Sequence, residues 1–138
     1  MHSLDSPTYV CCGSPLHIGH TTDCRTFAQE MIRVAIESPY AGDVAAHETY
    51  ARRAMKDSIT RGEAPIASHL LYTQEGILDD SDPVQRRLGI NCGFAWSGQA
   101  HLFAFYIDYG FSRGMDDAML EAVRLKKRIV QREIGKNP

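Results

Sequence analysis

No stretch of this 138-residue chain is apolar for long enough to cross a membrane. The longest apolar runs, such as residues 102–107, fall far short of the ~20 residues that a membrane span needs. The segment that begins at His2 lacks the basic and apolar regions of a signal peptide. The four cysteines are not spaced as in a secreted disulfide framework, so reduced thiols are expected. These absences predict a cytoplasmic protein.

The chain also lacks an excess of charge of either sign. Its 15 basic and 17 acidic residues leave a formal net charge of −2, so no overall field attracts nucleic acid or an anionic membrane. We therefore expect neither direct polynucleotide binding nor membrane binding, and any phosphate must be bound by local groups. The 43% hydrophobic content is ordinary for one globular domain.

Composition divides the chain near Met31. Residues 1–30 are polar and rich in Ser, Thr, His, Cys and Pro, with only a brief strand-like stretch at 8–11, and we interpret them as an N-terminal appendage of uncertain structure. The appendage contains enough Cys and His for a tetrahedral zinc site, although no standard finger has this spacing. The alternative is a flexible or strand-swapped segment with incidental Cys and His. The candidate zinc ligands are Cys11, Cys12, His17, His20 and Cys24.

Residues 31–138 alternate between strand and helix patterns. Strands are predicted at 32–37, 64–68, 101–108 and 128–134, and the very apolar 101–108 is predicted to be central. Helices are predicted after Asp43, from Pro83 to about Trp96 and after Ser112, with a long loop between residue 68 and Pro83. This order predicts a flavodoxin- or Rossmann-like α/β three-layer sandwich, with a mostly parallel sheet of four to five strands.

Three short segments lie at the carboxyl ends of predicted strands, at residues 38–43, 65–72 and 111–115. The carboxyl ends of parallel strands lie at one edge of the sheet, where open α/β sheets bind ligands. A helix start at Ser112 presents backbone amides to an anion, and Gly114 permits close approach of the backbone. Tyr40 offers an aromatic face to a base. We therefore predict a nucleotide ligand, although such turns are also common connectors.

Several motifs occur in a recognisable order: SPYAGD (38–43), PIASHLLY (65–72), LDDSDP (78–83), RLG (87–89) and SRGM (112–115). With these motifs the sequence resembles a family of small bacterial and phage proteins within the nucleoside 2-deoxyribosyltransferase-like superfamily. The resemblance covers nearly all of residues 31–134 and does not extend to residues 1–30. It implies the same α/β fold, and homo-oligomers of at least two copies. An apolar stretch around Phe94, Trp96 and residues 102–106 gives modest support for a dimer.

Enzymes of this superfamily cleave or exchange the N-glycosidic bond of nucleosides and nucleoside 5′-monophosphates. A glutamate on the helix after the third strand attacks the anomeric carbon, and a carboxylate suits the oxocarbenium-like transition state. The resemblance places this glutamate six residues after Ser112, where this chain has Ala118. Asp117, Asp108 and Asp80 are the candidate catalytic replacements. The alternative is that such acids are solvated charges, favoured on the first turns of a helix or in a capped turn.

The predicted nucleotide-binding residues come from the turns that follow the strands. The resemblance implies that Ser112 contacts a monophosphate, and His69 is a candidate for ligand binding or acid–base chemistry, unless it only organises its own loop. The full set is Ser38, Pro39, Tyr40, Gly42, Asp43, His69, Ser112, Arg113, Gly114 and Met115.

Two functions remain open from the sequence. The first is an enzyme that hydrolyses the N-glycosidic bond of a nucleoside 5′-monophosphate or transfers its deoxyribosyl group. The second, favoured by Ala118, is a catalytically inactive protein that senses or sequesters a nucleotide. Neither function invokes a cofactor or a metal in the domain.

Overall fold

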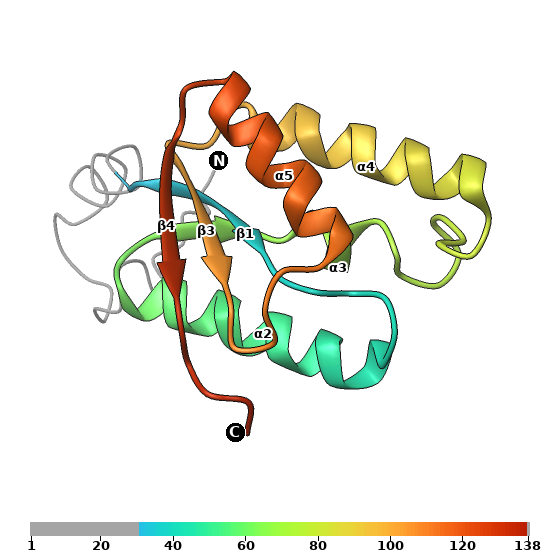
Figure 1. Ribbon diagram of the computed structural model, residues 1–138, viewed down its shortest axis with the longest axis horizontal. Coiled ribbons are helices and arrows are strands. Elements are labelled where there is room, and N and C mark those ends of the chain that lie inside the picture. The colour runs from blue at the N-terminus through green and yellow to red at the C-terminus, as the bar shows by residue number, and fades with distance from the viewer. Residues whose placement is uncertain (1–30, 138) are drawn as a thin grey trace, which may run out of the picture. The chain divides into compact units, whose positions relative to one another are not determined.

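The computed structural model describes residues 31–137, which form an α/β fold (Figure 1). The four strands form one all-parallel sheet with the order β2-β1-β3-β4, and helices alternate with them along the chain. The predicted parallel α/β fold is therefore confirmed, with β1 and β3 as the central strands. The elements are β1 (Arg33–Glu37), α2 (Val44–Thr60), β2 (Ala64–Ile66), α3 (Ser68–Leu71), α4 (Pro83–Ser97), β3 (Leu102–Tyr106), α5 (Arg113–Arg124) and β4 (Arg128–Arg132).

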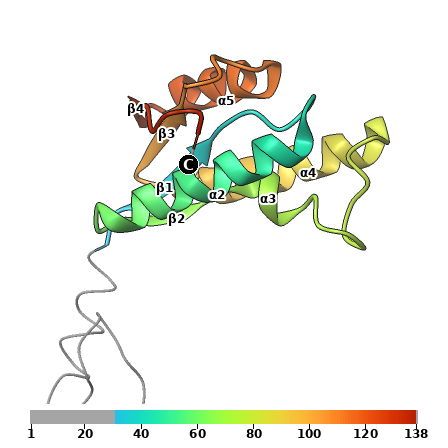
Figure 2. The same ribbon diagram turned by 90° about the horizontal axis from the view of Figure 1, so that it is seen from below.

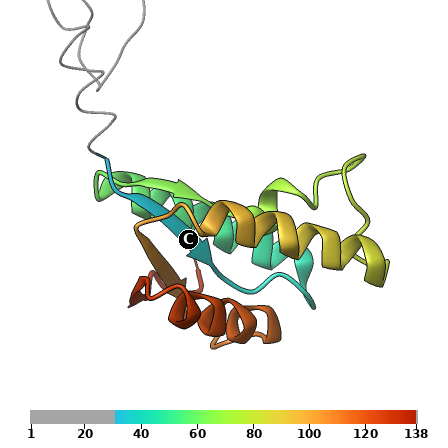
Figure 3. The ribbon, with the colours of Figure 1, turned by 90° about the horizontal axis from the view of Figure 1, so that it is seen from above.

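Helices cover both faces of the sheet. In the two edge-on views, α2 and α5 lie on opposite sides of the strands (Figures 2 and 3). On one face, the α2 residues Tyr50 and Ala54 pack against β1 and β3. On the other face, Met115, Ala118 and Ala122 of α5 pack against Phe103 and Phe105 of β3, with Phe94 of α4 beside them. Alternate residues of one strand thus contact different helices, because side chains alternate across a strand.

Strand β3 is the most deeply buried element. Each of its five residues is buried, as expected for a central strand covered on both faces. Removing a large apolar side chain such as Phe103 or Phe105 from water contributes about 1.5–3 kcal/mol to stability. The strand is shorter at both ends than the predicted range 101–108, because its pairing with the neighbouring strands begins at Leu102 and ends at Tyr106.

Three helices begin at predicted caps. Asp43 accepts a hydrogen bond from the Ala46 backbone amide at 3.2 Å. Asp82 accepts one from Val84 at 2.9 Å, with Pro83 following it in the first turn. Ser112 Oγ accepts one from the Met115 amide at 3.2 Å. Each cap satisfies one of the backbone amides that a helix start leaves without an intrahelical partner.

The segment after β2 differs from its prediction. β2 ends at Ile66 rather than residue 68, and the single-turn helix α3 replaces the start of the predicted loop. Helix α3 lies directly against α4 at Gly93, where an added Cβ would fall 2.5 Å from Ser68 Oγ. Only glycine permits this approach without displacement of Ser68. Four residues are too few to show helical periodicity, so tertiary packing rather than pattern defines this turn.

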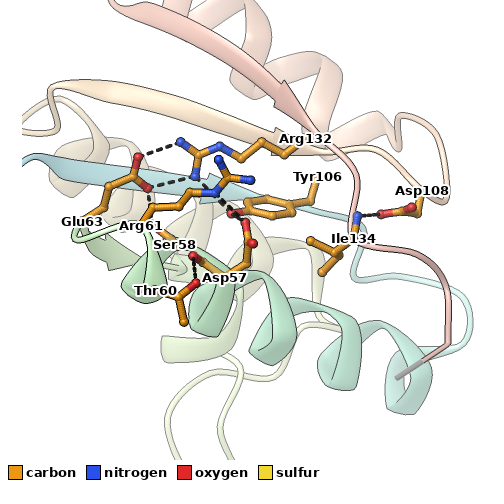
Figure 4. A network of polar contacts seen from close by, with 9 residues as sticks. All are labelled: Asp57, Ser58, Thr60, Arg61, Glu63, Tyr106, Asp108, Arg132 and Ile134. Carbon is orange, nitrogen blue, oxygen red and sulfur yellow. Dashed lines mark hydrogen bonds and ion pairs between the residues drawn. The ribbon is translucent and has the colours of Figure 1, made fainter.

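A polar network joins α2 to the strands β3 and β4 (Figure 4). Arg132 donates two hydrogen bonds to the Glu63 carboxylate, at 2.7 and 2.9 Å, and the two side chains are only 9% and 12% exposed. Ser58 Oγ donates to the same carboxylate at 2.7 Å. The Tyr106 hydroxyl accepts a bond from Arg132 and donates one to Asp57 at 2.8 Å.

None of the helices within residues 31–137 is both long and apolar enough to traverse a bilayer. The predicted strand at 8–11 and the five candidate zinc ligands lie outside the described residues.

Candidate functional site

A cavity opens at the carboxyl ends of β1 and β3. The strand order reverses direction between these two strands, and open α/β sheets bind ligands at such a switch point. The cavity encloses about 150 Å³, whereas a single water needs roughly 10–15 Å³, so it has room for part of a small molecule. Segments following β1 and β3 line it together with α3 and α4. The lining residues are Glu37, Ser38, Tyr40, Ala41, Ser68, His69, Tyr72, Thr73, Leu78, Asp80, Gln85, Arg86, Gly89, Ile90, Phe94, Ser112, Arg113, Gly114, Met115 and Asp117.

Glu37, the last residue of β1, places a carboxyl group in this cavity. Protein atoms surround the side chain, and part of its surface faces the open space of the cavity. Burial raises the pKa of Glu37 from 4.5 to about 8, with no neighbouring charge or hydrogen bond from the described residues opposing it. The carboxyl is therefore mostly protonated at neutral pH, and it offers a proton to whatever occupies the cavity.

Ser38 and His69 form a second polar element of the wall. Ser38 Oγ and His69 Nε2 share a hydrogen bond of 2.8 Å, and Ser38 is only 6% exposed. Burial lowers the pKa of His69 from 6.5 to about 4, so its imidazole is neutral near pH 7. The Tyr40 ring meets the His69 ring edge to face, with centroids 6.5 Å apart. These contacts fix the imidazole between two residues of the turn after β1.

The amino-terminal turn of α5 forms another part of the wall. Ser112, Arg113, Gly114 and Met115 all line the cavity. The backbone amides of Arg113 and Gly114 belong to the first turn, where a helix supplies no internal acceptor. A Cβ added to Gly114 would meet only Ser112 Oγ, at 4.0 Å, so the backbone here is open to a ligand. Such a turn favours an anion through its amides and through the helix dipole.

Acidic side chains reach the cavity from two directions. Asp117 of α5 is exposed and lines the cavity, whereas its neighbour Ala118 is 1% exposed and packs in the core. The two side chains diverge because a helix turns by about 100° per residue. Asp80 also lines the cavity, and its Oδ2 accepts a hydrogen bond from Arg86 Nη1 at 2.7 Å. This pair also borders an adjoining hollow that includes Gly42 and residues 75–79.

Residues 32–132 match the model of a protein family that is described as a domain of unknown function (DUF7768). The chain belongs to the DUF7768 family. No curated protein matches the chain. The match runs from the start of the sheet to the end of β4, so the DUF7768 domain contains every residue that lines the cavity.

The DUF7768 cavity brings together nine of the predicted site residues: Ser38, Tyr40, His69, Asp80, Ser112, Arg113, Gly114, Met115 and Asp117. Four others do not line it. Pro39 is buried beside Ser38, and Gly42 lines only the adjoining hollow. Asp43 caps α2, and Asp108 lies apart from both hollows.

Asp108 is engaged within the domain. It accepts hydrogen bonds from the Tyr50 hydroxyl at 2.6 Å and from the Ile134 and Gly135 amides at 2.8 Å. Figure 4 shows the bond from Ile134. Burial acts to raise the pKa of Asp108, but these hydrogen bonds outweigh it and the pKa falls below its ordinary value. Asp108 thus attaches the chain after β4 to the rest of the domain.

The site residues that sequence reasoning missed lie at the end of β1 and on α4. In the sequence, Glu37 resembles any charged residue that ends a strand. The sequence feature that could have indicated it is a single acidic residue between the apolar run 34–36 and the predicted ligand-binding turn at 38–43. On α4, Arg86, Ile90 and Phe94 line the cavity at a spacing of four residues. That spacing marks one helix face.

Proposed function

We propose that this domain processes a nucleoside 5′-monophosphate, by hydrolysing its N-glycosidic bond or by transferring its deoxyribosyl group. One observation carries the proposal: a single cavity at the switch point combines a helix amino terminus suited to phosphate with the carboxyl groups of Glu37 and Asp117. Cleavage of an N-glycosidic bond needs such groups, because positive charge develops on the sugar while the base leaves as an anion or accepts a proton.

The distribution of groups suggests how the nucleotide lies. The phosphate would bind at the first turn of α5, where Arg113 adds positive charge to the amides. Tyr40 offers a ring face for the base or sugar. Asp117, exposed in the wall one turn beyond Gly114, is the carboxylate that we assign to stabilise the developing oxocarbenium charge. The sequence resemblance to the nucleoside 2-deoxyribosyltransferase-like superfamily supports the same chemistry. We also propose that the protein acts in the cytoplasm, where such nucleotides are found.

The second candidate is a protein that binds a nucleotide without cleaving it. The favouring observation is Ala118, which occupies the position where the resemblance places the superfamily glutamate. In the structure Ala118 lies in the core against Phe103 and Phe105. If no other carboxylate takes over its role, the cavity would sense or sequester a nucleotide.

We expect the purified protein to release a free base from at least one member of a panel of ribo- and deoxyribonucleoside monophosphates. Mass spectrometry follows both the free base and the intact nucleotide that the protein retains. We further expect Asp117→Asn to reduce base release by about 10²-fold or more, because it removes charge stabilisation of the transition state. The matched control is Asp116→Asn, since Asp116 is exposed on the same helix and does not line the cavity.

Retention of intact nucleotide without base release would establish the binding function instead. Equal activity of the Asp117→Asn and Asp116→Asn variants would remove Asp117 from the mechanism while leaving the proposed reaction in place.

We also propose that the protein is a homo-oligomer of at least two copies. The apolar residues 102–106 do not support it, because β3 is fully buried in the core, but Trp96 of α4 is 53% exposed. Light scattering should give a mass of at least twice the 15.4 kDa of one chain. A mass of one chain at working concentration would contradict this proposal.

A further inference from the structure

We propose that Glu37 is the general acid that protonates the departing nucleobase. This inference rests on the proposed N-glycosidic cleavage and assigns one step within it. Three observations support the assignment: the position of Glu37 at the end of a central strand, its exposure to the cavity, and the absence of a partner for its carboxyl among the described residues.

The position of Glu37 makes it a fixed donor. Residues of β1 pair with β2 on one side and β3 on the other, and Glu37 itself pairs with Phe105. Pairing on both sides holds the backbone of this strand in place, which suits a side chain that must reach one atom of a bound substrate. No residue within 31–137 forms a hydrogen bond with the Glu37 carboxyl, so this group is free to contact a ligand in the cavity.

The other polar groups of the cavity are less suited to this role. His69 is hydrogen-bonded to Ser38 and remains neutral at pH 7, so it holds no imidazolium proton to give. Asp80 is paired with Arg86. Arg113 lies at the end where phosphate is expected, and Asp117 is exposed. The titratable and charged groups that line the cavity with Glu37 are Tyr40, His69, Tyr72, Asp80, Arg86, Arg113 and Asp117.

The environment of Glu37 matches the demands of an acid catalyst. A general acid acts best when its pKa lies near the working pH, and burial brings the pKa of Glu37 to about 8. In many enzymes with two catalytic carboxyl groups, burial raises the pKa of one group, which acts as the acid, while the other group is solvated and stays ionised. Here Glu37 has the buried position and Asp117 the solvated one.

In hydrolysis, Glu37 gives its proton to the base and recovers a proton from water. The bond between the anomeric carbon and the base nitrogen breaks, and its electron pair moves onto the base. Glu37 transfers its proton to the base, which leaves as a neutral molecule. The oxygen of a water molecule bonds to the anomeric carbon, and a proton from that water restores the acid form of Glu37. In a transfer reaction, a second nucleobase replaces the water.

The test compares a nucleotide cleaved by the wild-type protein with its cationic, base-alkylated analogue. For guanosine 5′-monophosphate the analogue is 7-methylguanosine 5′-monophosphate, whose positively charged base leaves without a proton from the protein. We expect Glu37→Gln to reduce base release from the unmethylated nucleotide by about 10²–10⁴-fold, the usual contribution of general acid catalysis. Release from the methylated analogue should change by less than tenfold. The matched control, Glu133→Gln, alters an exposed glutamate outside the cavity and should leave both rates unchanged.

The pH profile gives a second readout. Wild-type cleavage of the unmethylated nucleotide should fall as pH rises past about 8, because the acid form of Glu37 is lost, and the residual cleavage by Glu37→Gln should lack this fall. Equal losses for the two substrates in Glu37→Gln, or no loss for either, would overturn the assignment while leaving the proposed function intact. Absence of base release from every substrate by the wild-type protein would instead refute the proposed function, and the inference with it.

Discussion

We expect the Glu63→Gln variant to lose about 3–5 kcal/mol of unfolding free energy at pH 7, the usual result of removing one partner from a buried ion pair. Arg132 would keep its charge in a site where its side chain is 9% exposed. It would lose the opposing charge and one of its two carboxylate acceptors, and would keep the glutamine carbonyl oxygen, the Tyr106 hydroxyl and the nearby charge of Asp57. Urea unfolding followed by circular dichroism measures this loss.

Two comparisons isolate the buried charge as the cause. Glu121→Gln removes the partner of Arg124, whose side chain is 68% exposed, and should cost less than about 1 kcal/mol. The double variant Glu63→Leu with Arg132→Met removes both charges and should recover most of the loss, because apolar replacements of a buried pair are often neutral. A loss below about 1 kcal/mol in Glu63→Gln alone would show that this pair contributes no more than a surface contact.

The same pair predicts part of the acid sensitivity of the fold. The two hydrogen bonds from Arg132, with the one from Ser58, hold the pKa of Glu63 below its ordinary value of 4.5 against the opposing effect of burial. A lowered pKa contributes stability that is complete above pH 4.5 and is lost as pH falls through the lower folded-state pKa. Glu63→Gln should therefore weaken the pH dependence of stability in this acidic range.

The second large effect has the opposite sign. We expect Glu37→Gln to raise the unfolding free energy on the order of 4 kcal/mol at pH 8, and by less than about 0.5 kcal/mol at pH 4.5. Between these values the unfolded chain releases the Glu37 proton, whereas the folded protein, with a pKa of about 8, retains it. Wild-type stability therefore falls relative to the glutamine variant as pH rises through this window.

Urea unfolding at intervals between pH 4.5 and pH 8 measures the unfolding free energies of the wild-type protein and Glu37→Gln. Their difference cancels the contributions of titratable groups that both proteins contain. His69, with its pKa lowered to about 4, is among those shared groups. Glu133→Gln provides the flat reference, since Glu133 is exposed. A Glu37→Gln difference that does not vary with pH would show that the carboxyl is well solvated. An increase in stability together with lost turnover would be the usual trade-off at a functional site.

The fold was largely predictable because its signals are local. Helix starts at Asp43, Asp82 and Ser112 are marked by side chains that bond the next amides, and the apolar run around β3 indicates burial on both faces. Helix α3 was not predictable in this way. It depends on contact between Ser68 and Gly93, which are far apart in the sequence.

The site was predictable to the extent that it lies on turns after strands. The residues after β1 and the start of α5 converge as expected, because parallel strands align their carboxyl ends. Glu37 was missed because its chemistry comes from burial rather than from residue type or spacing. Asp108 was a candidate because an acid near the end of β3 resembles a catalytic group in the sequence, and in the structure its oxygens accept hydrogen bonds from Tyr50 and from the chain beyond β4.

The order of the sheet also limits how copies of this domain can associate. The two edge strands are β2, which has three residues and carries Pro65, and β4, which begins at the exposed Arg128. Proline has no amide hydrogen to offer an incoming strand, and charged residues on an edge oppose strand addition. A continuous sheet across two copies is therefore disfavoured. Helical surfaces such as the one bearing Leu120 and Val123, which are 70% and 60% exposed, are the better candidates for contact between chains.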